Sequence, residues 1–202
     1  YWRKGGGFPT PTGKLELYST VLENLGYDPL PYFKEPGESP YSTPELAKEY
    51  PLVLTSGFRS PFYFLAQYRN IPWLRSFMEY PTMQINPATA KKLGIEDGDF
   101  VWIESPRGRI IQKARLFPGI DPRVVAATAN WFYPEAPAQG FRGVFISNPN
   151  VLTNNDYQDP MYGSPDLTCL LCKVYKCKPE ELKDPQYAGI FTKEHGGKPW
   201  AW

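Results

Sequence analysis

The distribution of proline is the strongest constraint that this sequence places on its fold. The chain has 23 prolines and 17 glycines among 202 residues. Proline has no backbone N–H and breaks helices, so it limits helix content and restricts where strands can run. We therefore expect a protein of short strands joined by long, shaped loops.

Five short runs after residue 51 have the composition of β-strands, and one segment between them has complete helix signals. In that segment Asn86 is a helix cap, Pro87 suits the first helical position and Gly94 suits the end. The turn Ser105-Pro106-Arg107-Gly108 predicts a hairpin. The strand candidates are Leu52–Thr55, Thr82–Ile85, Phe100–Glu104, Gly108–Leu116 and Val124–Ala127. Many short strands with one clear helix predict a small, mainly β barrel with long loops.

The two flanks of this region differ from it in composition. Residues 1–50 are loop-rich, with a strand-like alternation at Lys14–Tyr18, a helical turn or two from Ser19 to Leu25, and a short helix over Thr43–Glu49. Thr43 is the expected cap of that last helix. Residues 179–202 read as a polar, extended packing tail. We therefore divide the chain into residues 1–50, 51–178 and 179–202.

Charge and hydropathy give no support to several classes of partner. The chain carries 22 basic and 21 acidic side chains, so no electrostatic argument favours nucleic acid or an anionic membrane. No run approaches the ~18 apolar residues of a membrane span. The first residues, Tyr1-Trp2-Arg3-Lys4, read as the interior of a longer protein, and no targeting signal is present.

The stretch Thr55-Ser56-Gly57-Phe58-Arg59 combines the features of an anion-binding turn. It follows an apolar run and ends in an arginine. Glycine lets a ligand approach the backbone closely, and the two hydroxyls and successive N–H groups can donate hydrogen bonds. Arg59 can grip a phosphate with two parallel hydrogen bonds. A polar turn at the end of a strand is the alternative explanation.

Other reactive side chains have simpler interpretations. Asp97 and Asp99 are read as turn formers, and the sole histidine, His195, lies in the tail, so no catalytic residue is assigned. The three cysteines form one Cys169-x-x-Cys172 pair followed by Cys177. A structural zinc site normally needs four ligands, so buried thiols are the favoured interpretation and a zinc or redox module is the alternative. No metal ligand is assigned.

Three segments in order resemble one family. They are Phe8-Pro9-Thr10-Pro11-Thr12-Gly13-Lys14-Leu15-Glu16-Leu17-Tyr18, then residues 85–108 with the Asn-Pro-Ala helix and Ser-Pro-Arg-Gly turn, then Asn148-Pro149-Asn150-Val151-Leu152-Thr153. Together with the turn at Thr55 they are similar to the C-terminal molybdopterin-dinucleotide-binding domain of the dimethyl sulfoxide reductase family. The resemblance covers roughly residues 8–177. Trp131–Glu135 and Leu171–Lys176 resemble segments of the polysulfide reductase and acetylene hydratase members.

The resemblance implies a six-stranded double-psi β-barrel, the last domain of a larger molybdenum or tungsten oxidoreductase. Such a domain holds the dinucleotide of a bis(molybdopterin guanine dinucleotide) cofactor, while the metal and any iron–sulfur cluster are bound by earlier domains. The implied partners are those remaining domains and an iron–sulfur electron-transfer subunit. The implied compartment is the cytoplasm or periplasm of a prokaryote. The isolated fragment is expected to lack the cofactor.

The resemblance also implies a set of cofactor contacts. Relatives often have His-Ser where this chain has Leu65-Ala66, which removes two polar partners beside Gln67. Asn86 could equally be only a helix cap, Asn150 and Asn155 only turn formers, and Lys173 only a solvated lysine. The expected contacts are Thr55, Ser56, Gly57, Arg59, Gln67, Asn86, Asn150, Asn155 and Lys173. The alternative function is a stand-alone β-barrel that binds another ligand or a protein.

Overall fold

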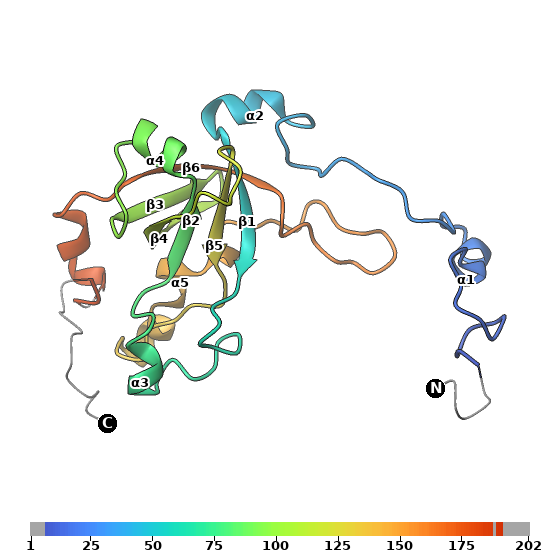
Figure 1. The fold of residues 1–202 in the computed structure, drawn as a ribbon, viewed down its shortest axis with the longest axis horizontal. Coiled ribbons are helices and arrows are strands. Elements are labelled where there is room, and N and C mark those ends of the chain that lie inside the picture. The colour runs from blue at the N-terminus through green and yellow to red at the C-terminus, as the bar shows by residue number, and fades with distance from the viewer. Residues whose placement is uncertain (1–6, 188, 192–202) are drawn as a thin grey trace.

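The structure is a computed structural model that describes residues 7–187 and 189–191 (Figure 1). Six strands make up the barrel: β1 (Leu52–Phe58), β2 (Thr82–Ile85), β3 (Phe100–Ser105), β4 (Gly108–Leu116), β5 (Val124–Thr128) and β6 (Leu170–Lys176). The α-helices are α1 (Thr20–Asn24), α2 (Pro44–Glu49), α3 (Pro72–Arg75), α4 (Pro87–Lys92) and α5 (Val144–Ser147). Short 3-10 helices are η2 (Ala138–Gly143), η3 (Pro149–Val151), η4 (Glu181–Lys183) and η5 (Pro185–Tyr187).

The strands close into a barrel in the order β1-β5-β2-β4-β3-β6. β1 runs parallel to β5 and β2 runs parallel to β4, whereas the other neighbours are antiparallel. Closure pairs every strand on both sides, so no strand is left as an open edge. The expected six-stranded β-barrel with few short helices and long loops is confirmed.

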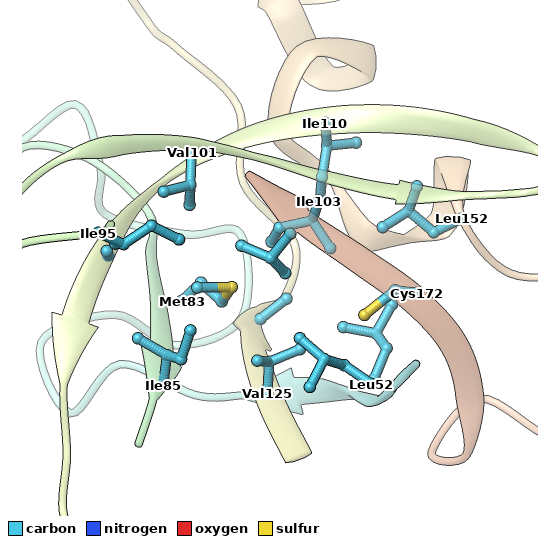
Figure 2. Packing of buried hydrophobic residues seen from close by; sticks show 14 of the residues in the cluster. Leu52, Met83, Ile85, Ile95, Val101, Ile103, Ile110, Val125, Leu152 and Cys172 are labelled. Atoms are coloured by element: carbon cyan, nitrogen blue, oxygen red, sulfur yellow. The ribbon is translucent and has the colours of Figure 1, made fainter. Parts of the chain in front are cut away.

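The barrel interior is filled by aliphatic side chains from alternate positions of the strands. Leu54, Met83, Ile85, Ile103 and Val125 are each 0% exposed. Figure 2 shows Met83, Ile103 and Val125 converging from different strands, with the sulfur of Cys172 among them. Alternation along each strand sends every second residue to this core.

A second cluster, which we call the aromatic cluster, packs outside the barrel. Trp131 and Tyr133 are fully buried there and make edge-to-face contacts with each other. Phe191 packs against Tyr80, Phe100, Tyr133 and Tyr187. The predicted packing tail after residue 178 does pack in its described part, which buries Tyr187, Ile190 and Phe191. It is not extended as expected, because it forms η4 and η5.

Three local predictions need correction. Lys14–Tyr18 is not a strand, because it finds no partner strand among the described residues. Thr43 stands at the cap of α2, but its hydroxyl donates to the Ser39 carbonyl instead of accepting from the helix. β6 was not among the predicted strands, although Cys169–Cys172 was recognised as a buried run.

The first described segment lies apart from the barrel. We call residues 7–33 the arm; in Figure 1 the arm, with α1, extends away from the strands. α1 contains no buried residue, and Leu17 and Phe33 are more than four-fifths exposed, at 81% and 83%. The chain rejoins the barrel at Glu38 and Ser39, which are buried.

Candidate cofactor-binding site

The end of β1 has an irregular backbone. β1 and β5 keep a regular register up to Ser56 and Ala127, and then Phe58 pairs with Thr128, so Gly57 is left out of the pairing. Gly57 has φ +109° and a side chain placed there would meet open space. Only glycine adopts this conformation readily. Gly57 is therefore an exposed residue at a strand irregularity, without a partner residue in β5.

The side chains around this turn differ in how freely they could bind a ligand. Arg59 is exposed and follows the strand directly. Thr55 is half-buried, on the other face of the strand from Leu54. The Ser56 hydroxyl donates to the Leu167 carbonyl, so its proton is engaged within the chain and only its lone pairs remain. The turn can thus offer the Arg59 guanidinium and the Gly57 backbone to an anion.

The Asn-rich segment forms a compact loop, which we call the Asn loop (residues 148–156). The Asn148 side chain accepts from the Asn150 N–H at 3.1 Å and so caps η3. Thr153 Oγ1 donates to the Asn150 carbonyl at 3.2 Å. The side chains of Asn150 and Asn155 are exposed. Their amides can therefore offer donors and acceptors to a ligand outside the loop.

A buried ion pair joins the Asn loop to three other segments. Arg107, in the β3–β4 turn, donates from Nη1 and Nη2 to Glu38 at 2.7 and 3.0 Å. Arg107 Nε also donates to the Leu152 carbonyl at 2.6 Å, and Asn154 Nδ2 lies 3.4 Å from Glu38 Oε2. The Leu171 N–H donates to Glu38 Oε1 at 2.7 Å. Glu38, Arg107 and Asn154 were not among the predicted site residues.

Two predicted contacts lie away from the end of β1. Asn86 caps α4 by accepting from Ala88 N–H at 2.9 Å, while its amide donates to the Ile120 carbonyl at 2.8 Å. Ile85 pairs with Val125 near the start of β5, whereas Gly57 lies next to the end of β5. Both functional groups of Asn86 are thus engaged within the chain, toward the opposite end of β5.

Lys173 is held in ion pairs. Its Nζ lies 2.9 Å from Glu104 and 3.5 Å from Glu49, over the ring of Tyr50. The hydrogen bond to Glu104 is the largest cause that raises the pKa of Lys173. Since Leu52 pairs with Cys172, Lys173 lies beyond the start of β1 and not at its end. The structure does not bring Lys173 together with Gly57.

The loop after β1, which carries Gln67, contains a buried cation. Gln67 is exposed, but Arg69 is only 2% exposed. The Arg69 guanidinium lies over Trp131 at 4.6 Å and over Tyr63 at 5.2 Å, and its Nη2 donates to the Leu65 carbonyl at 2.9 Å. Burial lowers the pKa of Arg69 to about 10. Arg69 thus anchors the loop that carries Gln67 to the aromatic cluster.

The cysteines do not converge. Cys172 faces the barrel core, Cys177 belongs to the aromatic cluster and the Cys169 thiol donates to the Glu38 carbonyl at 3.6 Å. Burial raises the pKa of all three thiols, that of Cys177 to about 12. Among residues 7–187 and 189–191, no three His, Cys, Asp or Glu side chains are grouped as metal ligands would be.

The exposed groups fit a dinucleotide by their chemistry. A phosphate requires N–H donors and positive charge, which the open backbone at Gly57 and Arg59 provide. A purine edge requires paired donors and acceptors, which the exposed amides of Asn150 and Asn155 provide. Hydrogen bonds tie both the turn and the Asn loop to the segment around β6. The Ser56 hydroxyl donates to the Leu167 carbonyl. The Leu171 N–H donates to the Glu38 carboxylate, which also accepts from Asn154.

Comparison with known families agrees with this chemistry. The family model described as "Molydopterin dinucleotide binding domain" matches residues 52–170, more than half of the chain. The chain belongs to this family. The matched range begins with β1 and includes the turn at Gly57 and the whole Asn loop. The chain is therefore a molybdopterin-dinucleotide-binding domain of the dimethyl sulfoxide reductase family.

Individual relatives are similar over most of this domain. The chain is 40% identical to dopamine dehydroxylase of Eggerthella lenta over 86% of its length, and 40% identical to acetylene hydratase of Syntrophotalea acetylenica over 86%. It is 35% identical to dimethyl sulfoxide reductase DmsA of Escherichia coli over 80%. These matches cover 17%, 25% and 20% of those proteins, so the chain spans about a fifth of their length.

A solved structure shares the fold. Acetylene hydratase from Pelobacter acetylenicus superposes with a TM-score of 0.78 at 37% identity, over 88% of this chain and 25% of that one. Three quarters of the acetylene hydratase chain therefore lies outside the matched domain. Within the described part of the present chain, no helix has the length and apolar character needed to cross a bilayer.

Proposed function

We propose that this domain holds the dinucleotide of a bis(molybdopterin guanine dinucleotide) cofactor in a molybdenum or tungsten oxidoreductase. The observation that carries the proposal is the exposed strand irregularity at Gly57, followed by the exposed Arg59, within a domain of the molybdopterin-dinucleotide-binding family. When bound, the cofactor supplies the redox chemistry at its metal. The contribution of this chain is to bind and orient the dinucleotide.

Most of the predicted contacts have a part in this proposal. Gly57 and Arg59 bind the pyrophosphate, with Thr55 beside them. Ser56 stays a prediction from the resemblance, because its hydroxyl proton is donated to the Leu167 carbonyl. Gln67 reaches toward the pterin from the loop that Arg69 anchors. Asn150 and Asn155 pair with the edge of the guanine. Asn86 and Lys173 remain predictions from the resemblance alone, because the structure engages both side chains elsewhere.

The remaining domains of the parent protein are the proposed partners, and an electron-transfer subunit with iron–sulfur clusters is a further one. The arm supports the first of these, because it exposes Leu15, Leu17, Tyr32 and Phe33 to solvent. Apolar side chains gathered on one exposed segment are typical of a surface that another protein part covers. The relatives' greater length supports the same proposal.

The direct test is the metal and nucleotide content of the full-length protein that contains this chain. We expect molybdenum or tungsten by elemental mass spectrometry, and guanine nucleotide in the supernatant after acid hydrolysis. Substitution of Arg59 by glutamine should reduce the nucleotide recovered, because a phosphate would lose its charged partner. Protein that contains neither metal nor nucleotide when made in a host that synthesises the cofactor would contradict the proposal.

A further inference from the structure

We propose that Glu38 is a positioning residue for the dinucleotide: it fixes the Asn loop against the barrel through Arg107 and Asn154. The inference rests on the proposed function, since the Asn loop carries the guanine contacts. Glu38 itself is 4% exposed and does not reach solvent where a ligand would lie. It therefore acts through the groups that it holds.

The carboxylate of Glu38 is the meeting point of four segments. It follows the arm in the chain and accepts from Arg107 in the β3–β4 turn, from the backbone N–H of Leu171 in β6 and from Asn154 in the Asn loop. Charge-assisted bonds of this kind are shorter and stronger than neutral ones. The two-pronged contact with Arg107 also fixes the orientation of the guanidinium.

Arg107 carries this constraint to the Asn loop. While its two terminal nitrogens bind Glu38, its Nε donates to the Leu152 carbonyl at 2.6 Å. Ser105 Oγ donates to the same carbonyl at 3.2 Å. Leu152 is fully buried, so the loop is held at its centre and the exposed amides of Asn150 and Asn155 lie on either side of a fixed point.

Electrostatics make the arrangement depend on the Glu38 charge. The side chains of Arg107 and Glu38 are 23% and 5% exposed, so each charge is removed from most of its hydration. Removal of one partner from such a pair leaves the other charge uncompensated. Without the carboxylate, Arg107 would turn toward water and release the Leu152 carbonyl. The Asn154 amide and the Leu171 N–H would lose the same acceptor.

The chain contains a matched control, which is a second buried ion pair away from the Asn loop. Arg75 Nη2 and Glu135 Oε1 are 3.0 Å apart, with side-chain exposures of 1% and 6%. Substitution of Glu135 therefore removes a carboxylate that is buried to a similar extent as that of Glu38. Arg75 packs over Trp131 of the aromatic cluster, and neither Arg75 nor Glu135 belongs to the Asn loop.

The experiment compares E38Q, R107K and E135Q in the full-length protein, expressed in a host that makes the cofactor. Nucleotide released by acid is measured per folded polypeptide, and amide hydrogen exchange is followed in peptides that cover residues 148–156. We expect E38Q and R107K to lower nucleotide content by about tenfold or more, by analogy with the loss seen when groups that orient metal ligands are removed. Exchange in the Asn loop should become faster in both variants.

E135Q separates positioning from general stability. It should lower the thermal midpoint by a similar amount, yet keep wild-type nucleotide content and wild-type exchange in the Asn loop. Equal nucleotide loss in E135Q and E38Q, or wild-type content in both E38Q and R107K, would overturn the positioning role and leave the proposed function standing. Wild-type protein without nucleotide would overturn the proposed function, and the positioning role with it.

Discussion

Gln112 shows what a single polar side chain does inside this barrel. It lies on β4 and is 0% exposed. Its amide nitrogen donates to the carbonyls of Thr128 and Ser147, at 3.0 and 2.8 Å, and its amide oxygen accepts from the Thr128 N–H at 3.0 Å. The amide thus satisfies the backbone where β5 ends and α5 approaches the barrel.

Substitution Gln112→Leu should destabilise the protein severely. It would leave three buried backbone groups without their partner, at a cost of about 3 kcal/mol or more in the free energy of unfolding. Denaturant unfolding followed by tryptophan fluorescence measures this loss. Gln84→Leu, at a half-buried position of β2, is the control and should change stability by less than about 0.5 kcal/mol. A loss in Gln112→Leu no larger than that of the control would disprove the role.

The thiols should differ in their reactivity toward iodoacetamide. Burial raises the pKa of Cys172 and Cys177, so less thiolate exists at pH 8 and alkylation is slower than for an ordinary thiol. Cys169, which is half-buried, should react first and the other two more slowly. Peptide mass spectrometry after timed quenching measures the order. In urea the three rates should become equal, and a folded-state rate for Cys172 that matches Cys169 would contradict the packing.

At the scale of elements, local signals predicted those parts that interact mainly with their neighbours in the chain. α4 was recognisable because its cap, its first-turn proline and its terminal glycine all act within the same few residues. β6 was missed because it begins with Leu170, Leu171 and Cys172, none of which is β-branched or aromatic. Its first residues therefore lack the composition that is enriched in strands.

Substitution Asn86→Ala should separate the two explanations of this residue. It removes the cap of α4 and the bond to the Ile120 carbonyl, so we expect a loss of about 1–2 kcal/mol in the free energy of unfolding. Because both amide groups are engaged locally, nucleotide content should stay at the wild-type level. Asn86→Asp keeps the cap acceptor and should recover part of the stability. A fall in nucleotide content of Asn86→Ala without loss of stability would instead favour direct contact with the cofactor.

At the scale of the whole molecule, the barrel and the arm contribute unequally to stability. The arm buries no residue of α1, and its one interaction with the rest of the described chain that we identify is a hydrogen bond from Tyr27 Oη to the Pro160 carbonyl, at 3.3 Å. Glu38, a few residues further on, is part of the buried network of the barrel. We therefore expect the energetic boundary to lie between the arm and Glu38, whereas composition predicted a boundary at residue 50.

Two truncations test this boundary. A chain that begins at Lys34 should unfold within about 3 °C of the complete chain, because little buried area is lost. A chain that begins at Tyr41 lacks Glu38 and leaves Arg107 without its carboxylate, so its midpoint should fall by about 6 °C or more. Differential scanning calorimetry measures both. Equal midpoints for the two truncations would show that the Glu38 network contributes no stability.

The sequence by itself determined the fold class, five of the six strands and the helix at Pro87–Lys92, and it predicted an anion-binding turn at Gly57. These features depend on alternation, caps and turn residues, which act over a few positions of the chain. Only the tertiary structure decided which candidates lie together. Arg107 and Glu38 are 69 residues apart in the chain, and no local pattern in either segment indicates their pairing.

Contacts between residues far apart in the chain also explain why some predicted cofactor contacts are engaged elsewhere. Asn86 and Lys173 have the right chemistry for a ligand, but closure of the barrel places partners beside them that lie far along the chain. Ser56 lies in the predicted turn, but its hydroxyl donates to the Leu167 carbonyl. Residue type determines what a side chain can bind, whereas strand register and barrel closure determine which of its groups remain free, because they bring distant residues within hydrogen-bond distance.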